Sequence, residues 1–156
     1  MPRLSAAAAA YVALQRVADL LGRDMAGLLK DEGLPATQYN VLRILRGAGP
    51  AGCACGEVAA RMITKDPDVT RLLDRMEKQG WIARARGSLD RRVVTVRITK
   101  AGLSLVNRLD RPVEARHRAT LGQLGARRLS ALTGELEALE SLLTESHPSN
   151  RYDDNR

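Results

Sequence analysis

Arginine and lysine residues are concentrated in one stretch of this 156-residue chain. Between Arg61 and Lys100 there are eleven basic and five acidic residues, so this stretch holds nearly all of the formal net charge of +7. Such cationic groups bind phosphates, anionic lipid headgroups or carboxylates. The charge alone therefore allows a nucleic acid, a membrane surface or an acidic protein as the partner. The order of apolar and charged residues within the stretch is needed to choose among these three.

The first half of the stretch has the pattern of a helix with one apolar and one polar face. Its apolar side chains recur at spacings of three and four, at Val69, Leu72, Leu73 and Met76. Asp66 followed by Pro67 predicts the N-terminal cap and first turn, and Gly80 followed by Trp81 predicts the end. Arg, Lys and Thr side chains reach base edges and phosphates when a helix lies in the major groove. The candidate DNA contacts on this helix, and just before it, are Lys65, Asp68, Thr70, Arg71, Asp74, Arg75 and Lys78.

After Trp81 the apolar period changes from about 3.6 to 2, which predicts a β-hairpin. Its strands are expected at 82–86 and 93–98, joined by a polar loop at 87–92. Arginines at a hairpin tip suit the narrow minor groove, where the negative potential is enhanced. The candidate DNA contacts of the hairpin are Arg84, Arg86, Ser88, Arg91 and Arg92. Asp90 would be repelled by phosphate, so we expect it to pair with a nearby Arg and hold the loop in shape.

A basic helix face by itself is most often only a solvated surface. Here a short helix at 56–63, with apolar Val58, Ala59 and Met62, precedes the basic helix, and the arginine-bearing hairpin follows it. This combination favours duplex DNA as the partner. Binding of RNA or single strands would need exposed aromatic side chains on the sheet, and Trp81 is more simply a core anchor.

Helices on both sides of this segment predict a mainly α fold with one small β-hairpin. Apolar periodicity indicates a helix from Ala6 to about Lys30, a second capped by Thr37, and a fifth capped by Thr99 and bent at Pro112. Leucines in the last helix alternate gaps of three and four, the seam of a coiled coil, at Leu129, Leu132, Leu136, Leu139 and Leu143. A monomer would leave that seam exposed, so we expect a dimer. The polar tail at 146–156 is expected to be disordered.

The chain resembles the multiple antibiotic resistance regulator (MarR) family. The resemblance covers residues 6–145 and rests on motifs at 66–82 (Asp-Pro-Asp-Val-Thr-Arg-Leu-Leu-Asp-Arg-Met-Glu-Lys-Gln-Gly-Trp-Ile), at 90–92 (Asp-Arg-Arg) and at 98–102 (Ile-Thr-Lys-Ala-Gly). Weaker similarity lies at 34–42 and 56–59.

The resemblance implies a winged helix-turn-helix at about 37–99 within one domain, 1–145, with dimerisation helices at about 6–32 and 100–145. It implies a homodimer on a near-palindromic operator, with residues 66–78 as the recognition helix, Arg92 in the minor groove and Asp90 as its structural partner. Members usually repress transcription and release DNA when a small phenolic or lipophilic ligand, or an oxidant, reaches the dimer. No ligand residues can be assigned from the sequence.

Other signals are weaker. The glycine pattern at 47–52 matches G-x-G-x-x-G, but it follows a helix and contains Pro50, so we interpret it as a loop and expect no cofactor. Cys53 and Cys55 are expected to be packing residues; a redox switch is the alternative, but the first helix lacks the Cys by which the family's peroxide sensors resemble one another. His117 and His147 do not form a metal site.

The chain shows no catalytic motif, so we expect a protein that is not an enzyme. It has no apolar run long enough for a membrane span and no secretory signal, which predicts a cytoplasmic protein with no membrane partner. The leading function is a DNA-binding repressor. A basic module that binds an acidic protein, and a thiol-based redox regulator, are the alternatives.

Overall fold

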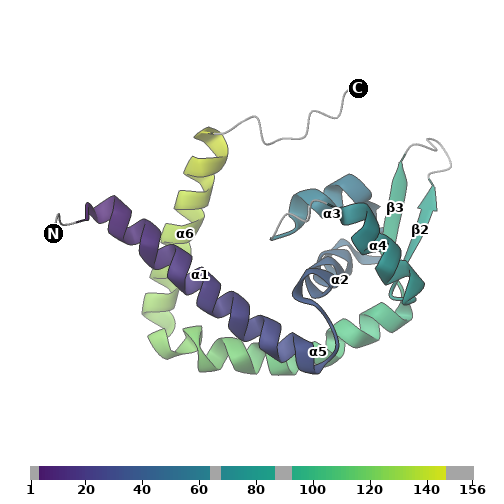
Figure 1. Cartoon of the computed structure of the whole chain (residues 1–156), viewed down its shortest axis with the longest axis horizontal. Coiled ribbons are helices and arrows are strands. Elements are labelled where there is room, and N and C mark those ends of the chain that lie inside the picture. The colour runs from purple at the N-terminus through teal and green to yellow at the C-terminus, as the bar shows by residue number, and fades with distance from the viewer. Residues whose placement is uncertain (1–3, 64–67, 87–92, 147–156) are drawn as a thin grey trace. The chain divides into compact units, whose positions relative to one another are not determined.

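The computed structural model describes residues 4–63, 68–86 and 93–146, and Figure 1 shows its elements in chain order. They are α1 (Ala6–Asp31), α2 (Ala36–Ala48), the 3₁₀ helix η1 (Gly49–Ala51), β1 (Cys53–Ala54), α3 (Cys55–Arg61), α4 (Val69–Lys78), β2 (Ile82–Arg86), β3 (Val94–Ile98), α5 (Lys100–Ala119), η2 (Leu121–Leu124) and α6 (Ala126–Ser146). The predicted fold class is confirmed. The chain divides into two compact units, 1–113 and 114–156.

The first two helices begin at different kinds of residue. The Oγ atom of Ser5 accepts a hydrogen bond from the N–H of Ala8 at 3.2 Å and caps α1, which ends at Asp31 as its periodicity predicts. Helix α2 begins directly after Pro35, whose carbonyl accepts the N–H of Tyr39 at 3.0 Å. The predicted cap Thr37 is therefore wrong. Pro35 already has the fixed φ, here −58°, of the residue before a helix, so the helix begins two residues earlier.

The sheet has three strands in the order β1-β3-β2, all antiparallel. The predicted hairpin is confirmed in β2 and β3, where Ile82 pairs with Ile98 and Arg86 with Val94. Strand β1, in which Cys53 pairs with Val96, was not predicted from the sequence. A strand of two residues is too short to show an alternating pattern, so it read as loop.

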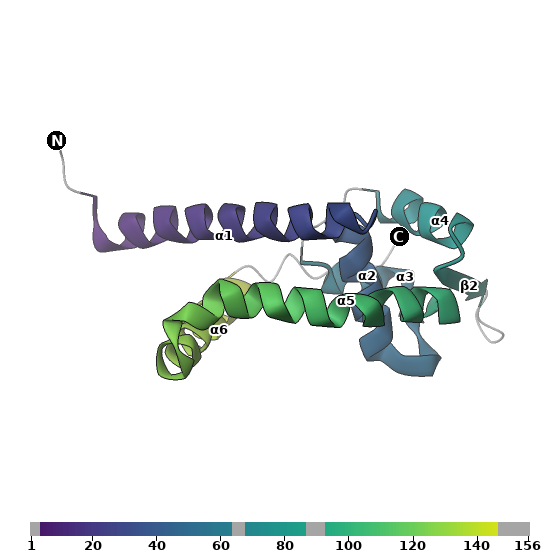
Figure 2. The same cartoon turned by 90° about the horizontal axis from the view of Figure 1, so that it is seen from below.

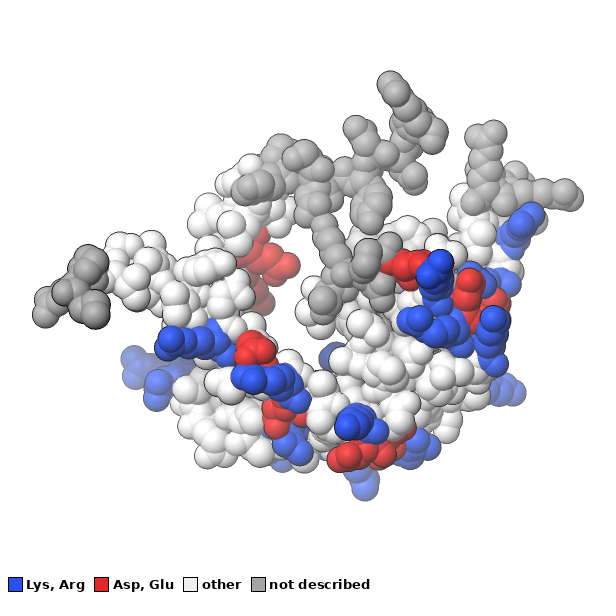
Figure 3. Space-filling view, viewed as in Figure 1, with Lys and Arg blue, Asp and Glu red and all other residues white. Residues whose placement is uncertain are grey.

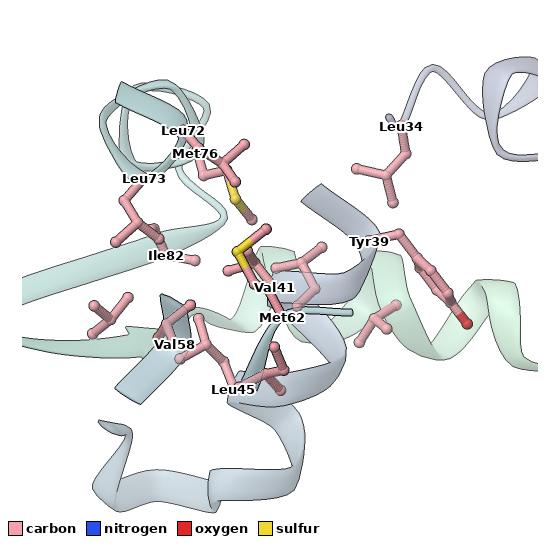
Figure 4. Close-up of a cluster of buried hydrophobic side chains, with 14 of the residues drawn as sticks. Leu34, Tyr39, Val41, Leu45, Val58, Met62, Leu72, Leu73, Met76 and Ile82 are labelled. Carbon is pink, nitrogen blue, oxygen red and sulfur yellow. The ribbon is translucent and has the colours of Figure 1, made fainter. Parts of the chain in front are cut away.

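The core of the first unit holds α4 against α2 and α3. Figure 4 shows Leu72, Leu73 and Met76 of α4 pointing toward Val58 of α3 and Val41 of α2. All five are at most 1% exposed. Burying a side chain of this kind contributes about 1.5–3 kcal/mol, so the apolar stripe fixes which face of α4 remains outside.

Helix α5 runs without interruption from Lys100 to Ala119 (Figure 2), with Pro112 inside it. Val106 and Leu109 of this helix are fully buried, whereas Leu103 is exposed. The predicted bend at Pro112 stays a prediction.

The second unit contains the end of α5, η2 and α6. No described residue of α6 is buried, and Leu132, Leu136 and Leu139 of the predicted seam are 38%, 41% and 39% exposed. Ser146 is the last residue of α6, and the rest of the predicted tail lies outside the described residues. Among the described helices, none is both long and apolar enough to cross a bilayer.

Candidate nucleic-acid interface

Asp68 caps the basic helix α4. The Oδ1 atom accepts a hydrogen bond from the backbone N–H of Arg71 at 3.0 Å, and Oδ2 forms an ion pair with Nε of the same residue at 2.9 Å. The predicted cap, Asp66, is therefore wrong. Asp66 and Asp68 are equally good capping residues, and their spacing of two gives no local signal to choose between them. Residues 64–67, which include the candidate contact Lys65, lie outside the described residues.

The end of α4 and the start of the hairpin are joined by a tight turn. Gly80 has φ +74°, and the N–H groups of Gly80 and Trp81 donate to the carbonyls of Glu77 and Met76 at 2.9 and 3.0 Å. This left-handed closure confirms the predicted role of Gly80, because other residues disfavour that conformation. Strand β2 therefore starts at a fixed place and direction relative to α4.

Thr99 connects this turn to α5. Its Oγ1 atom donates to the carbonyl of Gly80 at 2.7 Å and accepts the N–H of Gly102 at 3.1 Å. The predicted cap of the fifth helix is thus confirmed. The same side chain holds both ends of the hairpin region to α5.

The outer face of α4 is basic. Four of the predicted contacts on it, Thr70, Arg71, Arg75 and Lys78, are exposed, and they lie opposite the buried stripe. Figure 3 shows basic side chains gathered over this part of the molecule with acidic ones among them. The structure therefore presents the helical half of the predicted interface to solvent.

Arg84 and Asp74, both predicted DNA contacts, lie against each other. The Arg84 Nη2 atom is 2.5 Å from Asp74 Oδ1 and 2.7 Å from Glu77 Oε2, and only 23% of the Arg84 side chain is exposed. Hydrogen bonds from the side chain and backbone of Arg84 lower the pKa of Glu77. Glu77 was not among the predicted site residues. No local pattern relates Glu77 to Arg84, which meet only because the chain reverses at Gly80.

The wing of the predicted winged helix-turn-helix is the hairpin of β2 and β3. The structure describes its two strands but not the connecting residues 87–92. Arg86, the last residue of β2, is exposed. The candidate contacts Ser88, Arg91 and Arg92, and the predicted structural partner Asp90, lie outside the described residues. Their roles stay predictions.

The two cysteines are free and at least partly buried. Cys53 is 6% exposed in β1, Cys55 begins α3, and burial raises the pKa of both thiols. A reactive cysteine needs a lowered pKa, so this environment does not favour the redox alternative. Among the described residues no three His, Cys, Asp or Glu side chains form a metal-binding group. His117 is exposed, and His147 lies outside the described residues.

Two helices followed by an antiparallel hairpin, with a basic outer face on the second helix, define a winged helix-turn-helix protein. Comparison with known proteins agrees. The model of the MarR family matches residues 34–94. The homoprotocatechuate degradative operon repressor of Escherichia coli is 30% identical over 115 residues, which cover 74% of this chain and 76% of that protein.

The transcriptional regulator PecS of Dickeya dadantii is 30% identical over 97 residues, which cover 62% of this chain and 58% of PecS. Among solved structures, a MarR transcription factor from Planctomyces limnophilus is 37% identical, with a TM-score of 0.66, and the match covers 88% of this chain and 99% of that one. The chain belongs to the MarR family of transcriptional regulators.

Proposed function

We propose that this protein is a dimeric, sequence-specific repressor that binds duplex DNA and releases it when a small aromatic or lipophilic molecule binds. The observation that carries the proposal is the outer face of α4, where Thr70, Arg71, Arg75 and Lys78 are exposed while the opposite stripe is buried. A cationic helix face held rigidly outward is what major-groove recognition requires.

The size and order of side chains on α4 fit this role. Its ten residues span about 15 Å, and the major groove admits a helix. Recognition helices contact base edges mainly through their N-terminal residues, which places Thr70 and Arg71 nearest the bases. Arg75 and Lys78, farther along, suit phosphate contacts. In this proposal Arg86 continues the basic surface onto the wing, and Ser88, Arg91 and Arg92 complete it.

A second copy of the chain would cover the leucine seam of α6. Leu132, Leu136 and Leu139 are each more than a third exposed, and water-exposed leucines at coiled-coil spacing favour association. Each protomer would then present one α4 and one hairpin to half of a near-palindromic site.

The effector class rests on the relatives. The Escherichia coli relative is named for a homoprotocatechuate degradative operon, and homoprotocatechuate is a phenolic acid. A phenolic or similarly lipophilic molecule is therefore the first class to screen. Measuring DNA release in the presence of such compounds tests this part independently of DNA binding itself.

The DNA-binding part is tested with a duplex selected by the wild-type protein from a random-sequence library. We expect Arg71→Ala to weaken binding by about 1–3 kcal/mol and relax specificity, and Lys78→Ala to reduce the slope of log K against log salt by about one. Arg23→Ala, on α1 and far along the chain from the interface, is the control and should change neither quantity. Unchanged binding in both interface variants, or displacement of the DNA by polyglutamate more readily than by competitor DNA, would support an acidic protein partner instead.

A further inference from the structure

Arg84 of β2 joins two carboxylates of α4. Its Nε and Nη2 atoms donate to Glu77 Oε2 at 2.9 and 2.7 Å, and Nη2 also donates to Asp74 Oδ1 at 2.5 Å. Asp74 and Glu77 are one helical turn apart on α4, so one guanidinium spans that turn. Charge-assisted bonds of this kind are stronger and more directional than neutral ones.

Glu77 also binds the backbone of the same arginine. Strand β2 lies at the edge of the sheet, and the backbone N–H of Arg84 donates to Glu77 Oε1 at 2.9 Å. An edge strand leaves such N–H groups without a partner in the sheet. The two oxygens of Glu77 therefore fix both the side chain and the main chain of Arg84, and this attaches the base of the hairpin to the last turns of α4.

The network also changes the charge that α4 presents. Two carboxylates beside the exposed basic face would repel phosphate, and Arg84 offsets one of the two charges. The Arg84 side chain is 23% exposed, and its guanidinium already donates from two nitrogens, Nε and Nη2, to the carboxylates of α4, so less of it remains for an outside ligand. The other arginine on this strand, Arg86, is exposed and differs from Arg84 in this respect.

We propose that Arg84 is a positioning residue: it braces the hairpin against α4 through Glu77 and Asp74, and it does not itself bind phosphate. Asp74 and Glu77 are anchors for this brace and do not read bases. The proposal rests on the proposed function, because the brace matters only if α4 and the hairpin must engage neighbouring grooves together. Its failure would leave DNA binding by α4 intact.

The test compares Arg84→Gln, Glu77→Gln and the double variant on the selected duplex, at a temperature where circular dichroism shows every variant folded. We expect each single variant to raise Kd about tenfold and the double variant to be no worse than either single one, as coupled neighbours behave. The salt slope should stay at the wild-type value, unlike that of Lys78→Ala. Arg43→Gln, at an exposed arginine of α2 that lies over the ring of Tyr39, is the control and should leave Kd unchanged.

Two results would overturn the brace. A slope that falls by about one in Arg84→Gln would make Arg84 a phosphate ligand. Wild-type affinity in both single variants would mean that the network has no role in binding. The brace is also measured without DNA, through the amide ¹⁵N–¹H resonance of residue 84, which should shift in Glu77→Gln and not in Glu114→Gln. Failure to enrich any duplex with the wild-type protein would count against the proposed function, whereas an unmoved resonance would count against the brace alone.

Discussion

Arg46 of α2 and Asp110 of α5 form a two-point ion pair, in which the Nη1 and Nη2 atoms each lie 2.9 Å from a different carboxylate oxygen. The Nη1 atom of Arg46 also donates to Asn107 Oδ1 at 2.9 Å. This pair joins the helix on which α3 and α4 pack to the helix that leads out of the first unit. It is therefore a direct polar link between α2 and α5.

Removing this pair should destabilise the first unit. Arg46→Ala is expected to lower the free energy of unfolding by about 1 kcal/mol, because the pair is bidentate but its Asp110 side chain is half exposed, at 52%. Urea denaturation followed by circular dichroism measures it, and Asp110→Ala with the double variant gives the coupling energy. Arg111→Ala, a neighbouring exposed arginine, is the control. Equal unfolding midpoints for wild type and Arg46→Ala would contradict the link.

Gly102 is required where α5 approaches the turn before β2. A Cβ atom on this residue would collide with the carbonyl group of Trp81 and lie 3.1 Å from Cγ1 of Ile98. Gly102→Ala should therefore cost about 1–3 kcal/mol through overpacking, even though alanine favours helices. Gly56→Ala in α3, where the added methyl meets open space, is the matched control and should not destabilise. Thermal unfolding distinguishes the two variants. Similar unfolding midpoints for Gly102→Ala and Gly56→Ala would show that the backbone at residue 102 can move away from the carbonyl group of Trp81.

The lowered pKa of Glu77 predicts how stability depends on pH. A carboxyl group with a native pKa below its ordinary value of 4.5 stabilises the fold above that value, and the contribution is lost as the pH falls through the native pKa. The difference in unfolding free energy between wild type and Glu77→Gln should thus be largest near neutral pH and shrink in acid. Urea titrations from pH 7 to pH 3 measure this difference. A difference that grows in acid would mean that Arg84 does not hold the ionised form.

The cysteines should react slowly with thiol reagents in the folded protein. Burial raises the pKa of both above the ordinary 9.0, so little thiolate exists at pH 7. We expect dithionitrobenzoate to react much faster after unfolding in guanidinium, and peroxide to leave the affinity for the selected duplex unchanged. Rapid modification of the native protein, accompanied by loss of DNA binding, would revive the redox-regulator hypothesis.

Local signals were sufficient for the order of the α-helices, the hairpin and the turn at Gly80, but not for the first residues of α2 and α4. The change of period at Trp81 located the hairpin, Gly80 marked the end of α4, and Thr99 marked the start of α5, because each feature depends on a few consecutive residues. Strand β1 escaped because two residues cannot show a period, and Asp68 was not chosen as the cap because Asp66 offered the same chemistry.

The partner of Arg84 could not be found in the same way. The charge of Arg84 alone suggested that it contacts a phosphate. Only the folded turn at Gly80 shows that its guanidinium already donates to the carboxylates of Glu77 and Asp74. Arg71, Arg75 and Lys78 were easier to place, because their exposure follows from the apolar stripe on the same helix. Periodicity therefore identifies which face of a helix is exposed to solvent. Contacts between elements decide which charged side chains near that face remain available to bind a ligand.

The ratio of the affinities for a specific and a nonspecific duplex is the sharpest test of whether α4 reads a DNA sequence. Fluorescence anisotropy at physiological salt would compare the selected duplex with a scrambled duplex of the same length and composition. We expect the wild-type protein to bind the selected duplex at least about a thousandfold more tightly than the scrambled one. We also expect this ratio to fall in Arg71→Ala. Equal affinity of the wild-type protein for the two duplexes would contradict sequence-specific recognition.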